Sequence, residues 1–118
     1  MPRDDTLYLR HVLDAVDRIE EYLGNHDQAN FLKTPLIQDG VIRQLEILGE
    51  AVRHVSKNLR ATYPEVPWKD VAGMRDKLIH DYFGVDLSAV WLTATQDLIP
   101  LREQIRGILR DFGLDTPR

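Results

Sequence analysis

The stretch PLIQDGVIRQLEILGEAVRHVSKNLR, residues 35–60, decides the fold class. Its apolar side chains recur at alternating intervals of four and three residues, at Val41, Leu45, Leu48, Val52, Val55 and Leu59. This spacing predicts one long helix, from about Thr34 and Pro35 to Arg60, with a heptad-like seam along one side. Such a seam needs a long partner, which is either the first helix or a second copy of the chain. Gly49 within the seam marks a close helix–helix approach or a plain surface glycine.

Similar spacing predicts helices on both sides of this one. The first runs from about Asp5 or Thr6 to Leu23, because Gly24 and Asn25 are stop signals. Its apolar stripe consists of Tyr8, Val12, Ala15, Val16, Ile19, Tyr22 and Leu23. The proline-containing segment 61–67 is predicted to be a loop. A third long helix then begins at Pro67 or Trp68 and stops at Gly84.

The C-terminal part is predicted to be one interrupted helix. Asp86 caps a helix over 87–99, and Pro100 kinks or splits it. The continuation ends at Gly113 and carries four core residues, Leu101, Ile105, Ile108 and Leu109. The expected fold is therefore all-α, an up-and-down bundle of four to five helices. It forms a single domain over residues 1–118, with about 114–118 as a frayed tail.

Length and composition set broad limits on the kind of protein. The chain has 118 residues, which suits one domain, and it contains no cysteine, which fits a reducing cytoplasm. It has no apolar run of about 18 residues, so we expect no membrane span, and the start MPRDDTLYLR lacks the core of a signal peptide. The formal charge of −4 disfavours nonspecific coating of nucleic acid and leaves room for a local basic cleft.

The second informative stretch is MRDKLIHDYFGVD, residues 74–86. On a helical projection, Arg75 falls near the middle of an apolar arc. The arc consists of Trp68, Val71, Ala72, Met74, Leu78, Ile79, Tyr82 and Phe83. Because a guanidinium stays charged, Arg75 pairs with a buried carboxylate, extends its head to water, or faces a cleft.

His80 follows Asp76 by four residues, which is neighbour spacing on a helix. A carboxylate there can orient the imidazole and raise its basicity, and a solvated surface pair is the alternative interpretation. Arg75 and His80 are about 140° apart around the helix axis, so they flank one strip that could hold a phosphate. Tyr82 fits either a core position or the rim of that cleft.

The spacing Arg-x-x-x-x-His, with a Tyr two residues after the His, resembles the signature of the HEPN superfamily. The surrounding PWKDVAGMRDKLIHDYFGVDLSAVW, residues 67–91, resembles its HepT-like branch, the toxin half of a toxin–antitoxin pair. The resemblance extends over most of the chain. It implies a helical bundle, a homodimer with a composite cleft, and metal-independent cleavage of RNA through attack by a 2′-hydroxyl, with no cofactor.

The same resemblance implies roles for the motif residues. His80 would be the general acid or base, Arg75 would hold the phosphate, and Asp76 would be the supporting polar residue. Asp76 departs from the Asn often found after this Arg, which puts the rate of turnover in doubt. The implied partner is a small MNT-type nucleotidyltransferase antitoxin, as in a type VII-like system, which adds AMP to Tyr82. No membrane or DNA partner is implied.

Two further sequence features bear on this interpretation. A basic edge at the end of the long second helix is the first candidate for contacts to RNA, although a solvated face is its default interpretation; it consists of Arg53, Lys57 and Arg60. The four histidines do not have metal-ligand spacing, so no metal site is expected.

Two rival hypotheses remain open. The chain could be a non-catalytic helical partner of a nucleotidyltransferase, an interpretation that its net acidity and Asp76 favour. It could also be a structural dimer in which Arg75 pairs with a carboxylate such as Glu46 or Glu50.

Overall fold

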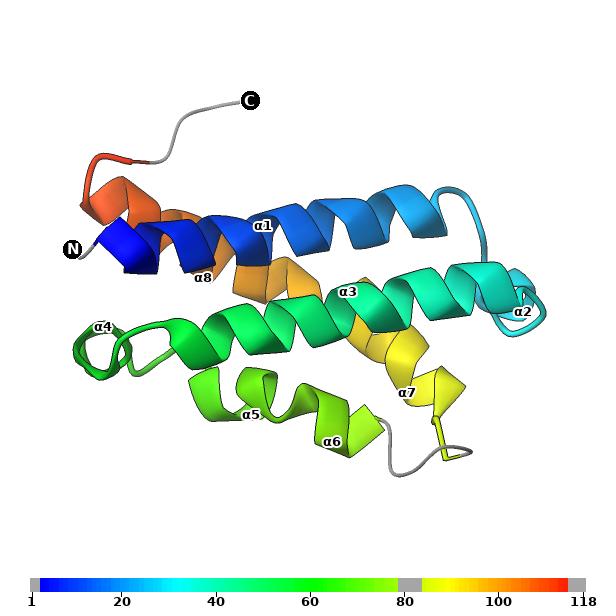
Figure 1. The fold of residues 1–118 in the computed structure, drawn as a ribbon. Helices are drawn as coiled ribbons and strands as arrows, with labels where there is room; N and C mark the ends of the chain where they lie inside the picture. Colours follow the sequence, from blue (N-terminus) through cyan, green and yellow to red (C-terminus); the bar gives the residue numbers. More distant parts are fainter. Residues whose placement is uncertain (1–2, 79–83, 115–118) are drawn as a thin grey trace.

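A computed structural model describes residues 3–78 and 84–114, and its regular elements over these residues are all helical. The long helices α1 (Arg3–Leu23) and α3 (Pro35–His54) run antiparallel (Figure 1), joined through the short helix α2 (Gln28–Phe31). The predicted all-α fold is confirmed. None of the helices in the described ranges is long and apolar enough to cross a membrane.

The predicted seam is confirmed, and its partner is the first helix. All six seam residues, from Val41 to Leu59, are at most 5% exposed. Most of the predicted stripe of α1 is buried against it, and Leu9 and Leu13 are buried as well. Tyr8 and Tyr22 are only partly buried. The first helix stops where Gly24 adopts a positive φ of 48°, as expected for a glycine stop.

The long second helix is shorter than predicted. It ends at His54, and a separate helix α4 (Lys57–Thr62) follows. Ser56 begins α4, and its hydroxyl accepts a hydrogen bond of 3.2 Å from the backbone N–H of Leu59. The carboxylate of Asp5 accepts two further bonds, from the Ser56 N–H at 2.8 Å and from its hydroxyl at 2.6 Å. Asp5 is 2% exposed, so this buried pair fixes the corner between α3 and α4.

The predicted third helix is also interrupted. Residues Trp68–Ala72 form α5 and residues Met74–Leu78 form α6, with Gly73 between them as the C-cap of α5. The N–H of Gly73 bonds the carbonyl of Lys69 at 3.0 Å. Glycine is the weakest ordinary helix former, which makes it the natural place for the chain to change direction. The predicted stop at Gly84 follows residues 79–83, which lie outside the described residues.

The C-terminal part matches the predicted interrupted helix, with the irregularity shifted. Asp86 caps α7 (Leu87–Leu92) by accepting a bond of 3.0 Å from the Ala89 N–H, as predicted. A π-helical turn, η1 (Thr93–Asp97), then leads into α8 (Leu98–Asp111). Pro100 lies in the first turn of α8. Proline has no N–H to donate, and its ring crowds the backbone of the preceding turn. The wider π-helical turn η1 gives the ring room.

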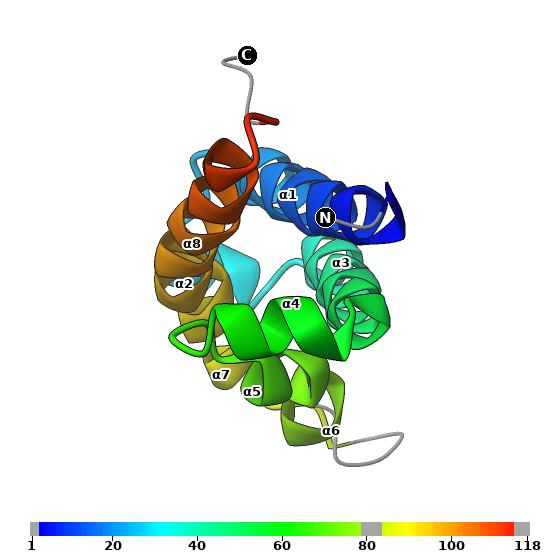
Figure 2. The ribbon, with the colours of Figure 1, turned by 90° about the vertical axis from the view of Figure 1, so that its left-hand side faces the viewer.

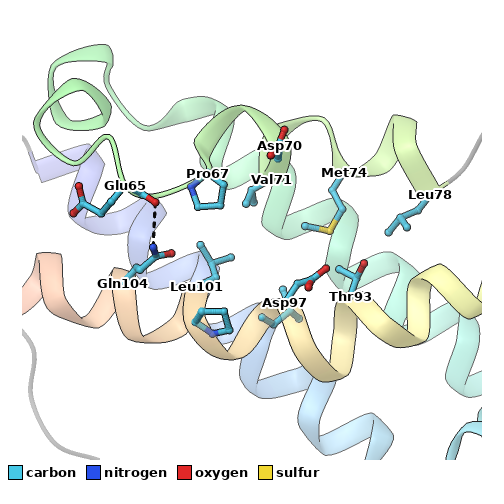
Figure 3. A pocket seen from close by; sticks show the side chains of 12 residues that line it. Glu65, Pro67, Asp70, Val71, Met74, Leu78, Thr93, Asp97, Leu101 and Gln104 are labelled. Carbon is cyan, nitrogen blue, oxygen red and sulfur yellow. Dashed lines mark hydrogen bonds between the residues drawn. The ribbon is translucent and has the colours of Figure 1, made fainter.

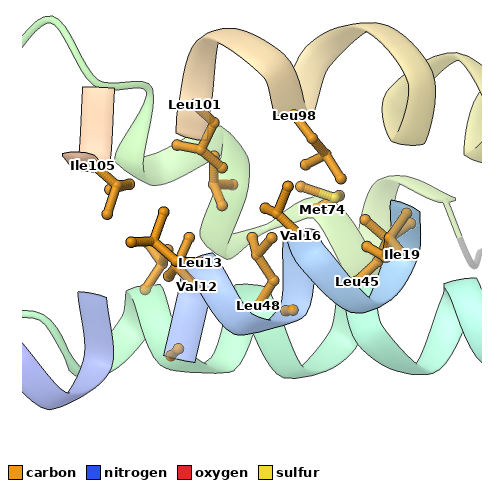
Figure 4. Close-up of a cluster of buried hydrophobic side chains, with 14 of the residues drawn as sticks. Val12, Leu13, Val16, Ile19, Leu45, Leu48, Met74, Leu98, Leu101 and Ile105 are labelled. Atoms are coloured by element: carbon orange, nitrogen blue, oxygen red, sulfur yellow. The ribbon is translucent and has the colours of Figure 1, made fainter. Parts of the chain in front are cut away.

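The four predicted core residues of α8 are buried, and α8 packs against α1. Figure 4 shows side chains of α1, α3, α6 and α8 meeting in one apolar cluster, and Figure 2 shows the helices around it end-on. On the outside, Arg102 of α8 binds two carboxylates of α1, Glu20 at 2.8 Å and Asp17 at 3.4 Å. Leu114, the last residue that the structure describes, is held against α1, because Arg10 donates a bond of 2.6 Å to its carbonyl oxygen.

Candidate active site

The motif helix α6 packs its apolar face into the molecule and leaves Asp76 exposed. Val71, Met74 and Leu78 are 6%, 7% and 3% exposed, which confirms this part of the predicted apolar arc. Asp76 takes part in an interaction within the protein and is not a free carboxylate. The amphipathic pattern therefore sets the orientation of α6.

The other predicted site residues lie largely outside what the structure describes. The backbone of Arg75 is part of α6, while its side chain is not among the described parts. His80 and Tyr82 fall within 79–83, outside the described residues. The convergence of Arg75 and His80 on one phosphate, the support of His80 by Asp76, and the three alternatives for the Arg75 head remain predictions.

Helix α3 holds the chain just before the motif. Nε of Arg53 donates a hydrogen bond of 3.1 Å to the carbonyl oxygen of Ala72, at the break between α5 and α6. A Cβ placed on Gly49 would lie 3.2 Å from the carbonyl oxygen of Val71, so the predicted close approach at this glycine is confirmed. The sequence predicts a solvated face or an RNA contact for Arg53 and gives no sign of this contact.

A small hollow of about 120 Å³ lies between α3 and the motif helix. Its wall combines one arginine with three carboxylates and is formed by Glu46, Gly49, Glu50, Arg53, Ala72 and Asp76. Glu46 and Glu50 are the residues that the ion-pair hypothesis names as partners of Arg75. The hollow is acidic in its described part, so a phosphate bound beside α6 would depend on Arg53 and Arg75 for positive charge.

A larger groove of about 440 Å³ lies behind the motif helix, between α5 and α6 on one side and η1 and α8 on the other (Figure 3). Its floor is apolar and includes Met74 and Leu78, and Glu65, Asp70 and Asp97 are among its lining residues. No lysine or arginine is among the described residues that line it. The charges of this described lining disfavour a nucleic-acid phosphate.

The predicted basic edge is divided between two helices. Arg53 lies on α3 and faces the motif helix, whereas Lys57 and Arg60 lie on α4, beyond the corner at Ser56. Lys57 is exposed, and Arg60 is half-buried with a buried Nε that has no hydrogen-bond partner in the described structure. The three residues therefore do not form the continuous edge of one helix, and RNA binding by them remains a prediction.

Ionisable groups give two further observations. Three or more potential metal ligands do not cluster anywhere in the described ranges 3–78 and 84–114. The hydrogen bond with Glu20 raises the pKa of Arg102 above its ordinary value, and burial opposes this. That shift belongs to the contact between α1 and α8 and not to the candidate site.

Comparisons with known proteins lead to the same family as the motif. A family model described as "Ribonuclease HepT-like" matches residues 12–108, a range that includes Arg75, Asp76, His80 and Tyr82. The chain is 40% identical over 102 residues to the "Probable ribonuclease HepT" of Thermococcus cleftensis, a match that covers 86% of this chain and 93% of the relative. It is 39% identical over 110 residues to the "Putative RNase MJ1216" of Methanocaldococcus jannaschii, covering 93% and 91%.

One relative is a longer protein. The chain is 40% identical over 112 residues to the "Gamma-glutamylcyclotransferase and putative RNase MJ0434" of Methanocaldococcus jannaschii; the match covers 95% of this chain but spans only half (50%) of that relative's length. No solved structure matches the chain significantly. The family match over most of the chain and the relatives at about 40% identity lead to one conclusion: the chain belongs to the HepT-like ribonuclease family.

Proposed function

We propose that this protein is an endoribonuclease toxin of a type VII-like toxin–antitoxin system, and that it cleaves RNA without a metal ion. The observation that carries the proposal is the HepT-like match over 12–108, which includes the Arg-x-x-x-x-His motif. Relatives named as a ribonuclease or a putative RNase support the same activity. A homodimer would bring two copies of the motif to one cleft.

In the proposed reaction, the imidazole of His80 takes the proton from a ribose 2′-hydroxyl. The 2′-oxygen attacks the adjacent phosphorus, and the bond to the 5′-oxygen breaks. The leaving oxygen takes up a proton, and the products are a 2′,3′-cyclic phosphate and a 5′-hydroxyl. Arg75 stabilises the negative charge that develops on the phosphate, and Asp76 orients the imidazole.

The proposed regulation acts on Tyr82. A cognate MNT-type nucleotidyltransferase would transfer AMP from ATP to the tyrosine oxygen and release pyrophosphate. The attached phosphate would place a negative charge near Arg75, occupy the anion site and repel RNA. Coexpression with the neighbouring nucleotidyltransferase, followed by mass spectrometry, should show additions in AMP-sized steps on the peptide that holds Tyr82. Tyr82→Phe should abolish these additions, because it removes the accepting oxygen.

The direct test of the activity is cleavage of total RNA by the pure protein in the presence of a chelator. The wild type should produce fragments that end in cyclic phosphate, and His80→Ala should produce none while keeping its helical circular dichroism. His26→Ala, at an exposed histidine after α1, is the matched control and should cleave like the wild type. Equal cleavage by pure His80→Ala protein would refute the catalytic role of this histidine.

A second candidate function is that of a non-catalytic partner that binds a nucleotidyltransferase. The specific observation in its favour is the acidic hollow beside the motif helix, with Glu46, Glu50 and Asp76 in its wall. On this hypothesis the pure protein cleaves no RNA under any buffer condition. It would still form a stable complex with the transferase, which co-purification and analytical ultracentrifugation would detect.

A further inference from the structure

A shallow groove lies on the outer side of α3, where this helix packs against the start of α1. It has a volume of about 620 Å³ and is lined in part by three rings, Tyr8, His11 and His54. The rings of Tyr8 and His54 stack, with centroids 5.0 Å apart and an interplanar angle of 20°. The ring of His11 meets Tyr8 edge-on at 6.0 Å. The His54 side chain is 52% exposed, so the stacked pair is open to solvent.

This space, called the α1–α3 groove below, is also lined by two arginines, Arg43 and Arg53. Of the two acidic residues in the lining, Glu50 binds Nε2 of His54 at 3.1 Å, and Glu46 is engaged in an interaction of its own. Arg43 is exposed, and no ion pair of its guanidinium is found within the described part of the chain. The carboxylates are thus occupied while a cation remains available.

The groove adjoins the hollow beside the motif helix. Glu46, Glu50 and Arg53 line both spaces, and the guanidinium of Arg53 reaches Ala72, the last residue of α5 before the motif helix. From Arg43 to Arg53 the groove follows α3 for about 15 Å at 1.5 Å per residue. At a rise of about 3.4 Å per nucleotide, a stacked single strand covers this length with about five nucleotides.

We propose that the α1–α3 groove binds the single-stranded RNA that leads to the motif. In this arrangement an unpaired base stacks on His54 and extends the Tyr8–His54 pair, and Arg43 holds a backbone phosphate. Aromatic platforms interleaved with cations are what single strands require, because any base offers a π-face and each phosphate a charge. The inference rests on the proposed ribonuclease function and adds the path of its substrate.

Binding can be measured separately from cleavage. The probe is a fluorescein-labelled 2′-O-methyl RNA hexamer, which lacks the attacking hydroxyl. The comparison probe is an abasic hexamer with the same phosphates. His54→Ala should weaken binding of the RNA probe about tenfold and leave the abasic probe unchanged. His54→Phe should retain binding, because the ring is kept. The readout is fluorescence anisotropy over a salt series.

The phosphate contact has a different signature. Arg43→Gln should weaken both probes and reduce the slope of log K against log salt by about 0.7, the value for one contact on a single strand. Lys33→Gln removes an exposed charge outside the groove and should change neither quantity. Equal losses on both probes for His54→Ala, or an unchanged slope for Arg43→Gln, would overturn the inference. A changed sedimentation coefficient in these variants would also overturn it, by assigning the groove to a protein contact.

Failure of the groove and failure of the proposed function give different results. If the hexamers bind as expected while the wild type cleaves no RNA, the ribonuclease proposal is wrong and RNA binding in the α1–α3 groove is supported. If His80→Ala abolishes cleavage while the groove variants bind RNA like the wild type, the ribonuclease proposal is supported and RNA binding in the α1–α3 groove is refuted.

Discussion

Nε of Arg53 donates a hydrogen bond of 3.1 Å to the carbonyl oxygen of Ala72, and this bond ties the long helix α3 to the chain three residues before Arg75. The carbonyl belongs to the last residue of α5, where the helix is interrupted. A side chain from another helix thus satisfies a backbone group at the break. Arg53 consequently has a structural role at the motif that is separable from any contact to RNA.

We expect Arg53→Lys to separate these two roles. Lysine keeps the positive charge but lacks the planar fork with its Nε donor, so the bond to Ala72 is lost. The variant should unfold about 0.5–1.5 kcal/mol more easily in urea, with faster hydrogen exchange in α5 and α6. The salt slope of RNA binding should stay unchanged. Unaltered exchange in these helices would show that the bond does not restrain the motif.

The buried contact between Asp5 and Ser56 gives a stability prediction. Asp5 is 2% exposed and accepts two hydrogen bonds from Ser56. Asp5→Ala leaves the N–H and hydroxyl of Ser56 without this acceptor, and should lower the free energy of unfolding by about 2–3 kcal/mol. The neighbouring Asp4 is exposed, and Asp4→Ala should change it by less than about 0.5 kcal/mol. Urea denaturation of both variants measures the difference.

The sequence predicted those parts of the fold that depend on apolar periodicity. The seam from Val41 to Leu59 is buried throughout because its side chains share one face whether or not the helix is continuous. Both helix breaks were missed: the break at Gly73 falls at a residue of low helix propensity, and the break at Ser56 depends on a contact that periodicity does not record. Ser56 starts a new helix and donates hydrogen bonds to Asp5, which is 51 residues away in the chain. A serine followed by a polar turn was the available signal, since serine is a common N-cap.

For the candidate site, the sequence predicted the family and the orientation of the motif helix but not the contacts that other helices make near it. The motif and its resemblance led to the family, and the burial of Met74 and Leu78 confirms the orientation of α6. The contact from Arg53 to Ala72 and the stacking of Tyr8 on His54 could not be predicted, because they join residues of different helices. Such contacts follow from how two helices pack, which local spacing leaves undetermined.

Gly49 and Gly107 form a matched pair of helical glycines. A Cβ on Gly107 would meet only the Arg110 side chain, at 3.8 Å, so Gly107→Ala should stabilise the protein by about 0.5–1 kcal/mol through helix propensity. A Cβ on Gly49 would lie 3.2 Å from the backbone oxygen of Val71, so α5 must shift. Gly49→Ala should therefore gain less stability than Gly107→Ala and should alter RNA cleavage. Equal gains in thermal unfolding would show that α5 moves freely.

Tyr63 gives a prediction for alkaline pH. Burial raises the pKa of Tyr63 above its ordinary value of 10.0, and the hydrogen bond to Asp111 and the charges of Asp111 and Glu65 add to the effect. Above about pH 10 the unfolded chain releases this proton while the folded protein keeps it. Stability from this group is thus complete below pH 10 and is lost as the pH rises through the folded pKa. Urea unfolding from pH 9 to 11 should show a steeper decline for the wild type than for Tyr63→Phe.

Arg75 decides between catalysis and structure. If its guanidinium stabilises a phosphate, Arg75→Gln should reduce RNA cleavage by about 10²-fold or more at an unchanged melting temperature. If it is a buried partner of Glu46 or Glu50, the same change leaves a carboxylate without its cation and should lower the melting temperature sharply. Arg18→Gln, at an exposed arginine of α1, controls for the loss of one positive charge. Because both quantities are measured on one preparation, a stable variant with full cleavage would exclude both roles.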